Sequence, residues 1–143
     1  MIHMHMDFEY LKDVKPLQIF DDKVISLLDA LSRELIKEGR GFPDVFTFGF
    51  WCRRASIEKM AAAYSGCFRI GRGIVFHIAP ANVAVNFAYS LVAGLLSGNS
   101  NIVRLPSKNF EQVKIIEGAM NTLLNKEYGH LKPYINFVRY EHD

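Results

Sequence analysis

The sequence has few of the features that mark a secreted, membrane-bound or nucleic-acid-binding protein. Two cysteines in 143 residues indicate no disulfide framework. A formal net charge of +2 gives no electrostatic basis for binding nucleic acid or an anionic membrane. The N-terminus lacks the basic region and apolar core of a signal peptide, and the longest apolar stretch, residues 83–96, is too short to span a bilayer. We therefore expect a cytoplasmic protein with no membrane span and no nucleic-acid partner.

The composition is that of a folded protein of ordinary size. Half of the residues are apolar, which excludes a mainly disordered chain, and the length suits one domain. No internal repeat or low-complexity stretch is visible. No metal site is predicted. His3 could form a Cu(II) or Ni(II) chelate with the terminal amine and the two amide nitrogens between them, but most such termini are accidental.

The first half of the sequence has a helical periodicity. Apolar residues recur at three- and four-residue spacings opposite charged ones, which is typical of amphipathic helices. The helices are expected over residues 21–37, 44–52 and 56–66. Asp21 or Asp22 is the expected N-cap of the first helix and Gly39 its stop, while Ser56 is the expected N-cap of the third. We assign residues 1–66 to a helical N-terminal segment.

The second half alternates short apolar runs with helical patterns. The strands are expected over residues 73–78, 101–105 and 134–138, and the helices over 83–96 and 110–126. The first strand is mostly apolar and β-branched, so we expect it to be buried on both faces. Strand, helix, strand, helix, strand with short connections predicts a parallel βαβαβ unit. Residues 67–143 are therefore assigned to a Rossmann-like α/β half domain that binds a nucleotide.

The first predicted strand is followed by Ala79-Pro80-Ala81-Asn82, and the second ends in the segment Arg104-Leu105-Pro106-Ser107-Lys108. Ligands of parallel sheets collect at the carboxyl ends of the strands, where backbone amides and helix dipoles converge. The basic and hydroxyl side chains of the second segment could hold a phosphate or a ribose. A Gly-x-Gly-x-x-Gly fingerprint is absent, because Gly71-Arg72-Gly73 precedes the strand instead of following it.

The sequence resembles the acyl-CoA reductase branch of the aldehyde dehydrogenase superfamily, which includes the fatty-acid reductase of bacterial luminescence. The resemblance covers residues 40–143 and is specific as a composite of several motifs. These are the turn at 78–83, the run Ala93-Gly94-Leu95-Leu96-Ser97-Gly98-Asn99-Ser100-Asn101-Ile102-Val103-Arg104-Leu105-Pro106-Ser107, and segments 50–59, 71–78 and 136–143. The superfamily binds nicotinamide dinucleotides without the usual glycine fingerprint.

The resemblance implies roles for eight residues. Asn82 falls on the side-chain amide that stabilises an oxyanion, and an amide suits that task because it donates without titrating. The turn Ile78, Ala79, Pro80 and Ala81 runs alongside the nicotinamide and pyrophosphate. Arg104 replaces a lysine that bonds the adenosine ribose, and Ser107 replaces the glutamate of many NAD-preferring members. With Lys108 nearby, this exchange removes a negative charge and adds cations, so the expected cofactor is NADPH.

The implied function is reduction of an acyl-CoA, or another acyl thioester, to an aldehyde. In the family a cysteine thiolate attacks the thioester, and neither Cys52 nor Cys67 matches that position. We therefore expect these residues to be the N-terminal portion of the enzyme, inactive without a C-terminal catalytic half. The alternative is a non-catalytic nucleotide-binding or interaction module left from a disrupted reductase gene. Self-association is also expected, because half a sheet leaves an exposed edge.

Simpler interpretations of single residues stay open at this point. Asn82 could merely cap the helix expected to begin at Val83. Arg104 and Lys108 could be solvated charges at a strand end. His77, on an apolar strand, is more often a hydrogen-bonded core histidine than an acid or base.

Overall fold

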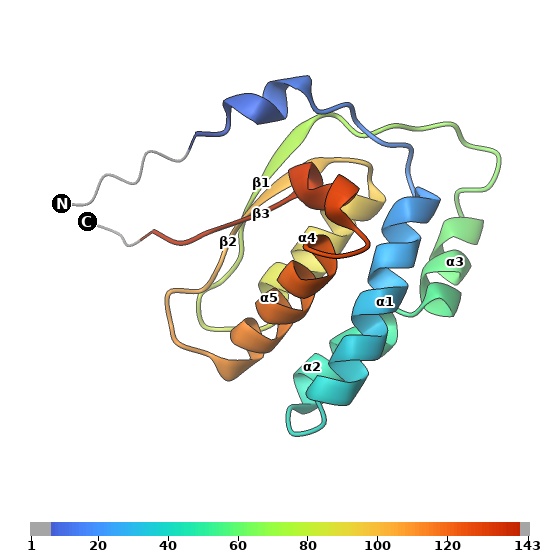
Figure 1. Cartoon of the computed structure of the whole chain (residues 1–143). Helices are drawn as coiled ribbons and strands as arrows, with labels where there is room; N and C mark the ends of the chain where they lie inside the picture. The colour runs from blue at the N-terminus through green and yellow to red at the C-terminus, as the bar shows by residue number, and fades with distance from the viewer. Residues whose placement is uncertain (1–6, 141–143) are drawn as a thin grey trace.

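The computed structural model describes residues 7–140, which form a group of helices packed against a three-stranded sheet (Figure 1). The elements in chain order are η1 (Glu9–Asp13), α1 (Asp22–Glu38), α2 (Pro43–Trp51), α3 (Arg54–Ala62), β1 (Ile74–Ile78), α4 (Asn86–Leu96), β2 (Ser100–Arg104), α5 (Glu111–Leu124), η2 (Gly129–Tyr134) and β3 (Ile135–Val138). The predicted fold class, a helical lead-in followed by βαβαβ, is confirmed. The short 3-10 helices η1 and η2 were not predicted, and His3 lies outside the described residues.

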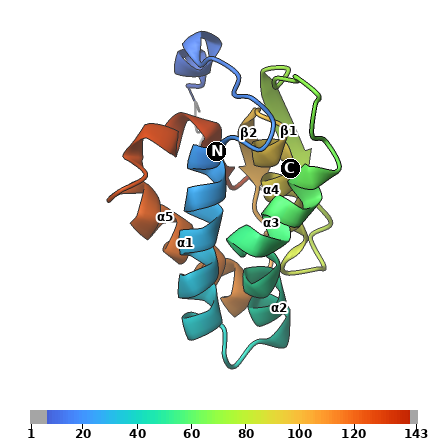
Figure 2. The ribbon, with the colours of Figure 1, turned by 90° about the vertical axis from the view of Figure 1, so that its right-hand side faces the viewer.

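Helix α1 is the centre of the helical part. Its apolar stripe is fully buried and packs against α2, α3 and α5 (Figure 2). Asp21 caps the helix by accepting the backbone N–H of Lys23 at 2.9 Å, and the N–H of Gly39 closes it on Leu35 O. Both predicted ends are confirmed. Within residues 7–140 no helix is both long and apolar enough to cross a membrane.

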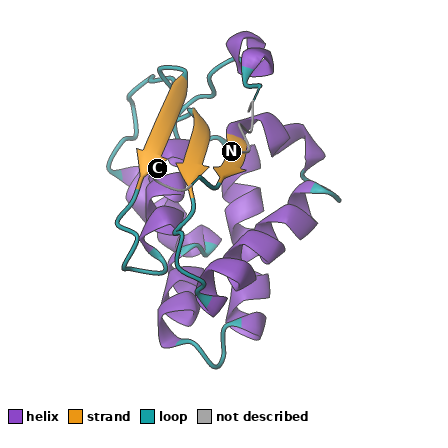
Figure 3. Cartoon of the chain, turned by 90° about the vertical axis from the view of Figure 1, so that its left-hand side faces the viewer, coloured by secondary structure: helices purple, strands orange, loops and turns teal. Residues whose placement is uncertain are grey.

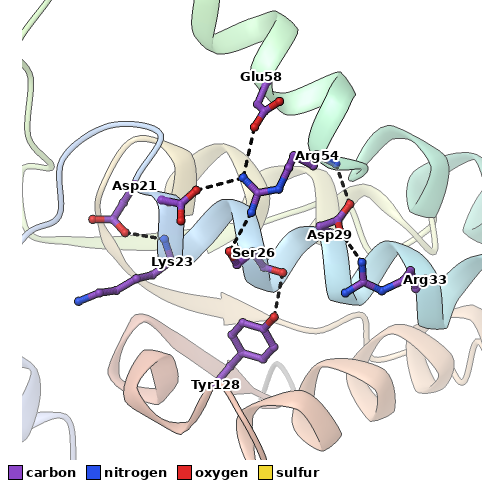
Figure 4. Close-up of polar contacts among 9 residues, drawn as sticks. Asp21, Lys23, Ser26, Asp29, Arg33, Arg54, Glu58 and Tyr128 are labelled. Carbon is purple, nitrogen blue, oxygen red and sulfur yellow. Dashed lines mark hydrogen bonds and ion pairs between the residues drawn. The ribbon is translucent and has the colours of Figure 1, made fainter.

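Helix α3 is capped by a residue from another helix. It begins at Arg54, two residues before the predicted N-cap Ser56, and Asp29 of α1 accepts the Arg54 backbone N–H at 2.9 Å. The Arg54 guanidinium donates to Ser26 Oγ of α1 at 2.9 Å (Figure 4). It also donates to the Asp22 carboxylate of the same helix at 3.0 Å. The prediction of Ser56 as cap was wrong because the orphan amide of this helix is satisfied across the helix–helix contact.

The sheet has the order β1-β2-β3, and both strand pairs are parallel. Figure 3 shows the strands side by side with the long helices behind them. Ile74 pairs with Ser100, and Asn101 pairs with Ile135. The first residues of the three strands therefore lie within about one residue of each other along the strand direction. Helices α4 and α5 connect consecutive parallel strands, as the βαβαβ pattern predicts. One large core joins this unit to the helical part; the division at residues 66 and 67 remains a prediction.

The opposite face of the sheet is only partly covered. Leu11 of η1 packs on Ile102 and Val138, and so shields β2 and β3. The outward residues of β1, namely Ile74, Phe76 and Ile78, are 49%, 48% and 65% exposed. The expectation that this strand is buried on both faces was wrong. Its composition is that of a core strand, but η1 stops short of it, and an apolar strip remains open.

Candidate functional site at the carboxyl edge of the sheet

The first two strands end next to each other. Ile78, the last residue of β1, is the register partner of Arg104, the last residue of β2. The two segments singled out in the sequence, 79–82 and 104–108, therefore leave the sheet at one edge. This edge is where ligands of parallel sheets bind. The structure brings the two predicted halves of the cofactor site together.

The turn after β1 is longer than expected. Helix α4 begins at Asn86, not at Val83, and its N-cap is Val85, which makes no side-chain cap. Asn82 is exposed in this turn and does not cap the helix, so the simple interpretation of Asn82 as a cap was wrong. The first turn of α4 contains no acidic residue and no capping side chain. The N–H groups of Ala88 and Tyr89 bond to Val85 O, so in this turn only those of Asn86 and Phe87 are left for an anion.

The segment after β2 carries cations close to aromatic rings. The Arg104 guanidinium is half-buried, and its Cζ lies 4.6 Å from the ring centre of Tyr140. Lys108 is exposed, with Nζ 5.3 Å from the ring of Phe110, and the Ser107 hydroxyl is also exposed. None of the ion pairs within residues 7–140 involves Arg104 or Lys108. Their positive charges are therefore not neutralised by a carboxylate of the described chain.

A buried polar cluster lies behind this edge, between the sheet and α4. His77 Nε2 is 2.8 Å from Asn101 Oδ1, and His77 Nδ1 is 2.6 Å from Ser90 Oγ. The Asn101 amide nitrogen donates to the carbonyls of Asn99 and Tyr134, so Asn101 Oδ1 accepts and His77 Nε2 donates. Both ring nitrogens have partners, which confirms His77 as a hydrogen-bonded core histidine.

Gly94 makes this cluster possible. A Cβ at this position of α4 would lie 2.0 Å from Asn101 Oδ1 and 2.9 Å from His77 Nε2. The glycine in the middle of an apolar helix therefore allows α4 to approach the His77–Asn101 pair. Sequence reasoning missed this cluster. The available signals were an asparagine inside an apolar strand and a glycine inside a helix.

The two cysteines do not lie at the edge. Cys52 follows α2 and is fully buried, and burial raises the pKa of its thiol to about 12. A thiol with that pKa stays protonated at neutral pH and is a poor nucleophile. Cys67 is exposed in the turn after α3, on the amino-terminal side of β1. Among residues 7–140 no group of three or more histidine, cysteine or acidic side chains could hold a metal ion.

Comparison with protein families agrees with this geometry. The family model described as "Acyl-CoA reductase (LuxC)" matches residues 54–143, well over half of the chain. The match includes all three strands and both segments of the carboxyl edge, but not residues 40–53 of the resemblance. Searches of curated proteins and of solved structures gave no match. On the strength of the family match, the chain belongs to the acyl-CoA reductase (LuxC) family.

Proposed function

We propose that the chain is the cofactor-binding portion of an NADPH-dependent acyl-CoA reductase, which reduces an acyl thioester to an aldehyde. The observation that carries the proposal is the pairing of Ile78 with Arg104, which puts the turn at 79–82 beside a cationic segment. The family reduces acyl-CoA with NADPH. When bound, the nicotinamide would supply the hydride that reduces the acyl group.

The residues at the edge suit a phosphorylated nucleotide. In the proposed site, Ile78, Ala79, Pro80 and Ala81 lie along the nicotinamide and pyrophosphate. The N–H groups of Asn86 and Phe87, at the start of α4, are the ones left to the phosphates. Arg104, Ser107 and Lys108 receive the adenosine ribose and its 2′-phosphate. A carboxylate in place of Ser107 would repel that phosphate, and the described edge carries none between 104 and 110.

Asn82 is the proposed oxyanion donor. Its side chain is exposed at the edge, and no hydrogen bond within residues 7–140 occupies its amide. An amide NH2 donates at every pH near neutrality, so it can stabilise the negative charge that develops on an attacked carbonyl oxygen. The role needs a thiolate nucleophile close by. Neither the buried Cys52 nor Cys67 supplies it, so we expect no aldehyde from acyl-CoA and NADPH with this chain alone.

Calorimetric titration of the 143-residue chain with NADPH and NADH tests the proposal. NADPH should bind at least tenfold more tightly than NADH, because only NADPH carries the 2′-phosphate. Arg104→Ala should lower the NADPH affinity roughly tenfold to hundredfold, the range of a charge-assisted hydrogen bond. Arg40→Ala, which removes an exposed arginine after α1, is the matched control and should bind like the wild type. Equal affinity for both nucleotides would contradict the assignment.

The second candidate is a non-catalytic interaction module. The open apolar strip Ile74, Phe76 and Ile78 favours it, because exposed apolar strands mark interaction surfaces. Light scattering separates the two functions: concentration-dependent association that Phe76→Lys abolishes, without any nucleotide binding, supports the module. Nucleotide binding by a monomer supports the cofactor-binding portion instead.

A further inference from the structure

A cavity of about 480 Å³ lies away from the proposed cofactor edge. Its walls come from the segment before α1, from α2, α3 and the C-terminal turn of α4, and from the loop before β1. Two of its lining residues, Arg72 and Asn99, stand just ahead of β1 and β2. The cavity is therefore at the amino ends of the strands, one strand length, about 13 Å, from the carboxyl edge. Its volume is in the range of small-molecule sites.

Most of the cavity wall is apolar. Phe20, Trp51, Met60, Tyr64 and Leu96 contribute to it, and the rings of Phe20 and Tyr64 contact each other with centres 5.4 Å apart. No aspartate or glutamate lines the cavity. The wall therefore suits a hydrocarbon chain and repels no anion.

Arg69, Arg72 and Asn99 contribute hydrogen-bond donors to the cavity, whereas the Ser97 hydroxyl already donates to Ala93 O at 2.7 Å. No ion pair within residues 7–140 involves Arg69 or Arg72. Asn99 is 7% exposed, and its Oδ1 accepts the backbone N–H groups of Arg72 and Gly73, at 2.7 and 3.3 Å. Its Nδ2 has no acceptor in the described chain. An amide donor without an acceptor and two exposed guanidinium groups therefore line the same cavity, and such donors can recognise a carboxylate.

The cavity is held open by backbone contacts among three segments. Leu17 donates to Gly98 O and accepts from the Gly71 N–H, both at 2.9 Å. Gly98 has a φ of +83°, and a Cβ there would lie 2.1 Å from Leu17 O, so only glycine permits this approach. Phe20 is held at a φ of +52°, a strained value for a bulky residue. Within residues 7–140 it is the one non-glycine residue with positive φ, and such strain concentrates at ligand sites.

We propose that this cavity binds a medium-chain fatty acid as its carboxylate. The hydrocarbon chain packs against Phe20, Met60 and Leu96, and the carboxylate accepts from Arg69, Arg72 and Asn99. A cationic ligand is disfavoured by the two arginines. A nucleotide is disfavoured because the apolar wall leaves the polar edges of its base unpaired. The site is separate from the cofactor edge and does not depend on the proposed function.

The single tryptophan of the chain provides the measurement. Trp51 lines the cavity, so its fluorescence should change when the cavity fills. The full chain is titrated with decanoate, 1-decanol and decyltrimethylammonium, each below its micelle concentration. Decanoate should saturate and should bind at least tenfold more tightly than the neutral and cationic analogues. Equal binding of decanoate and decyltrimethylammonium would overturn the proposal.

Two variants locate the site. Arg69→Ala/Arg72→Ala should weaken decanoate at least tenfold while leaving the affinity for decanol unchanged, whereas the control Arg40→Ala/Lys126→Ala should change neither. Ala93→Phe, on an exposed position of the cavity wall, should block both ligands without unfolding the chain, which circular dichroism checks. Unchanged decanoate binding in either variant, or loss of decanoate binding on Phe76→Lys at the open strip, would place the ligand elsewhere. Displacement of decanoate by NADPH would also contradict a separate site.

Discussion

Ile78 and Arg104 end two neighbouring parallel strands as register partners. This pairing converts two motifs 22 positions or more apart in the sequence into one edge of the sheet. The turn that begins at Ala79 and the cationic segment that ends at Lys108 therefore leave the sheet at the same edge. The family match covers both segments, and the proposed cofactor site depends on their adjacency.

Placing a carboxylate in the cationic segment should reverse the cofactor preference. Ser107→Glu puts a negative charge next to the proposed position of the 2′-phosphate, so NADPH affinity should fall at least tenfold while NADH affinity holds or rises. Calorimetric titration with both nucleotides measures the change. Ser65→Glu, in the exposed turn after α3, carries the same charge change away from the edge and should leave the preference as in the wild type. A similar loss in both variants would mean that net charge alone is responsible.

Gly94→Ala should destabilise the fold. The added methyl would lie 2.0 Å from Asn101 Oδ1, so α4 must shift from the sheet or break the His77–Asn101 hydrogen bond. We expect a loss of about 2–4 kcal/mol in the free energy of unfolding, measured by urea denaturation. Gly118→Ala in α5 is the control, since nothing lies within 4 Å of its Cβ, and it should stabilise by about 0.5–1 kcal/mol. Equal effects of the two substitutions would contradict the packing account.

The cap of α3 gives a third prediction. Asp29→Ala removes the acceptor of the Arg54 N–H and should cost about 1 kcal/mol of unfolding free energy. Asp29→Asn keeps an oxygen acceptor and should recover most of that loss. Ser56→Ala should be nearly neutral, because Ser56 lies inside the helix. If Ser56→Ala destabilised the fold more than Asp29→Ala, the result would contradict the cap by Asp29 and support Ser56 as the N-cap of α3.

Thiol labelling distinguishes the two cysteines. At pH 8 a disulfide reagent such as DTNB should modify one thiol per native chain, Cys67, and two in urea, because Cys52 is fully buried. Cys67→Ser should leave no reactive thiol in the native state. Rapid labelling of Cys52 in the folded chain would contradict its burial.

Cys52 also makes stability depend on alkaline pH. Its folded pKa of about 12 lies above the ordinary value of 9.0, so the neutral thiol favours the folded state. This contribution is fully present below pH 9 and is lost as the pH rises from 9 toward 12, up to about 4 kcal/mol for three pKa units. The unfolding free energy of Cys52→Ala should therefore fall less steeply over this range than that of the wild type. If the unfolding free energies of the two proteins fell equally steeply between pH 9 and 12, the Cys52 thiol would make no contribution to this pH dependence.

Local features of the fold could be predicted from the sequence, whereas contacts between distant segments could not. The stripe of α1 and its ends at Asp21 and Gly39 are encoded within one helix, and both predictions are confirmed. The cap of α3 comes from Asp29, 25 positions away, and no local pattern reports it. The exposure of β1 depends on where η1 ends on the sheet, so an apolar sequence was mistaken for a doubly buried strand.

The same distinction between local features and distant contacts applies to the functional sites. The motifs at 78–83 and 104–108 were found from the sequence because each is contiguous and follows a strand. The cavity was not found, because Phe20, Arg72 and Asn99 come from three separate segments that meet only through backbone contacts. The roles proposed for Asn82, Arg104, Ser107 and Lys108 remain predictions.

Mapping the NADPH contact by NMR tests the central claim most directly. Amide shifts of the 15N-labelled 143-residue chain are recorded as NADPH is added. The account predicts the largest changes at residues 78–83 and 104–108, and much smaller ones at 69–73 and 96–99 around the cavity. Largest changes at the cavity, or none at either place with NADPH in large excess, would contradict a cofactor site at the carboxyl edge of the sheet.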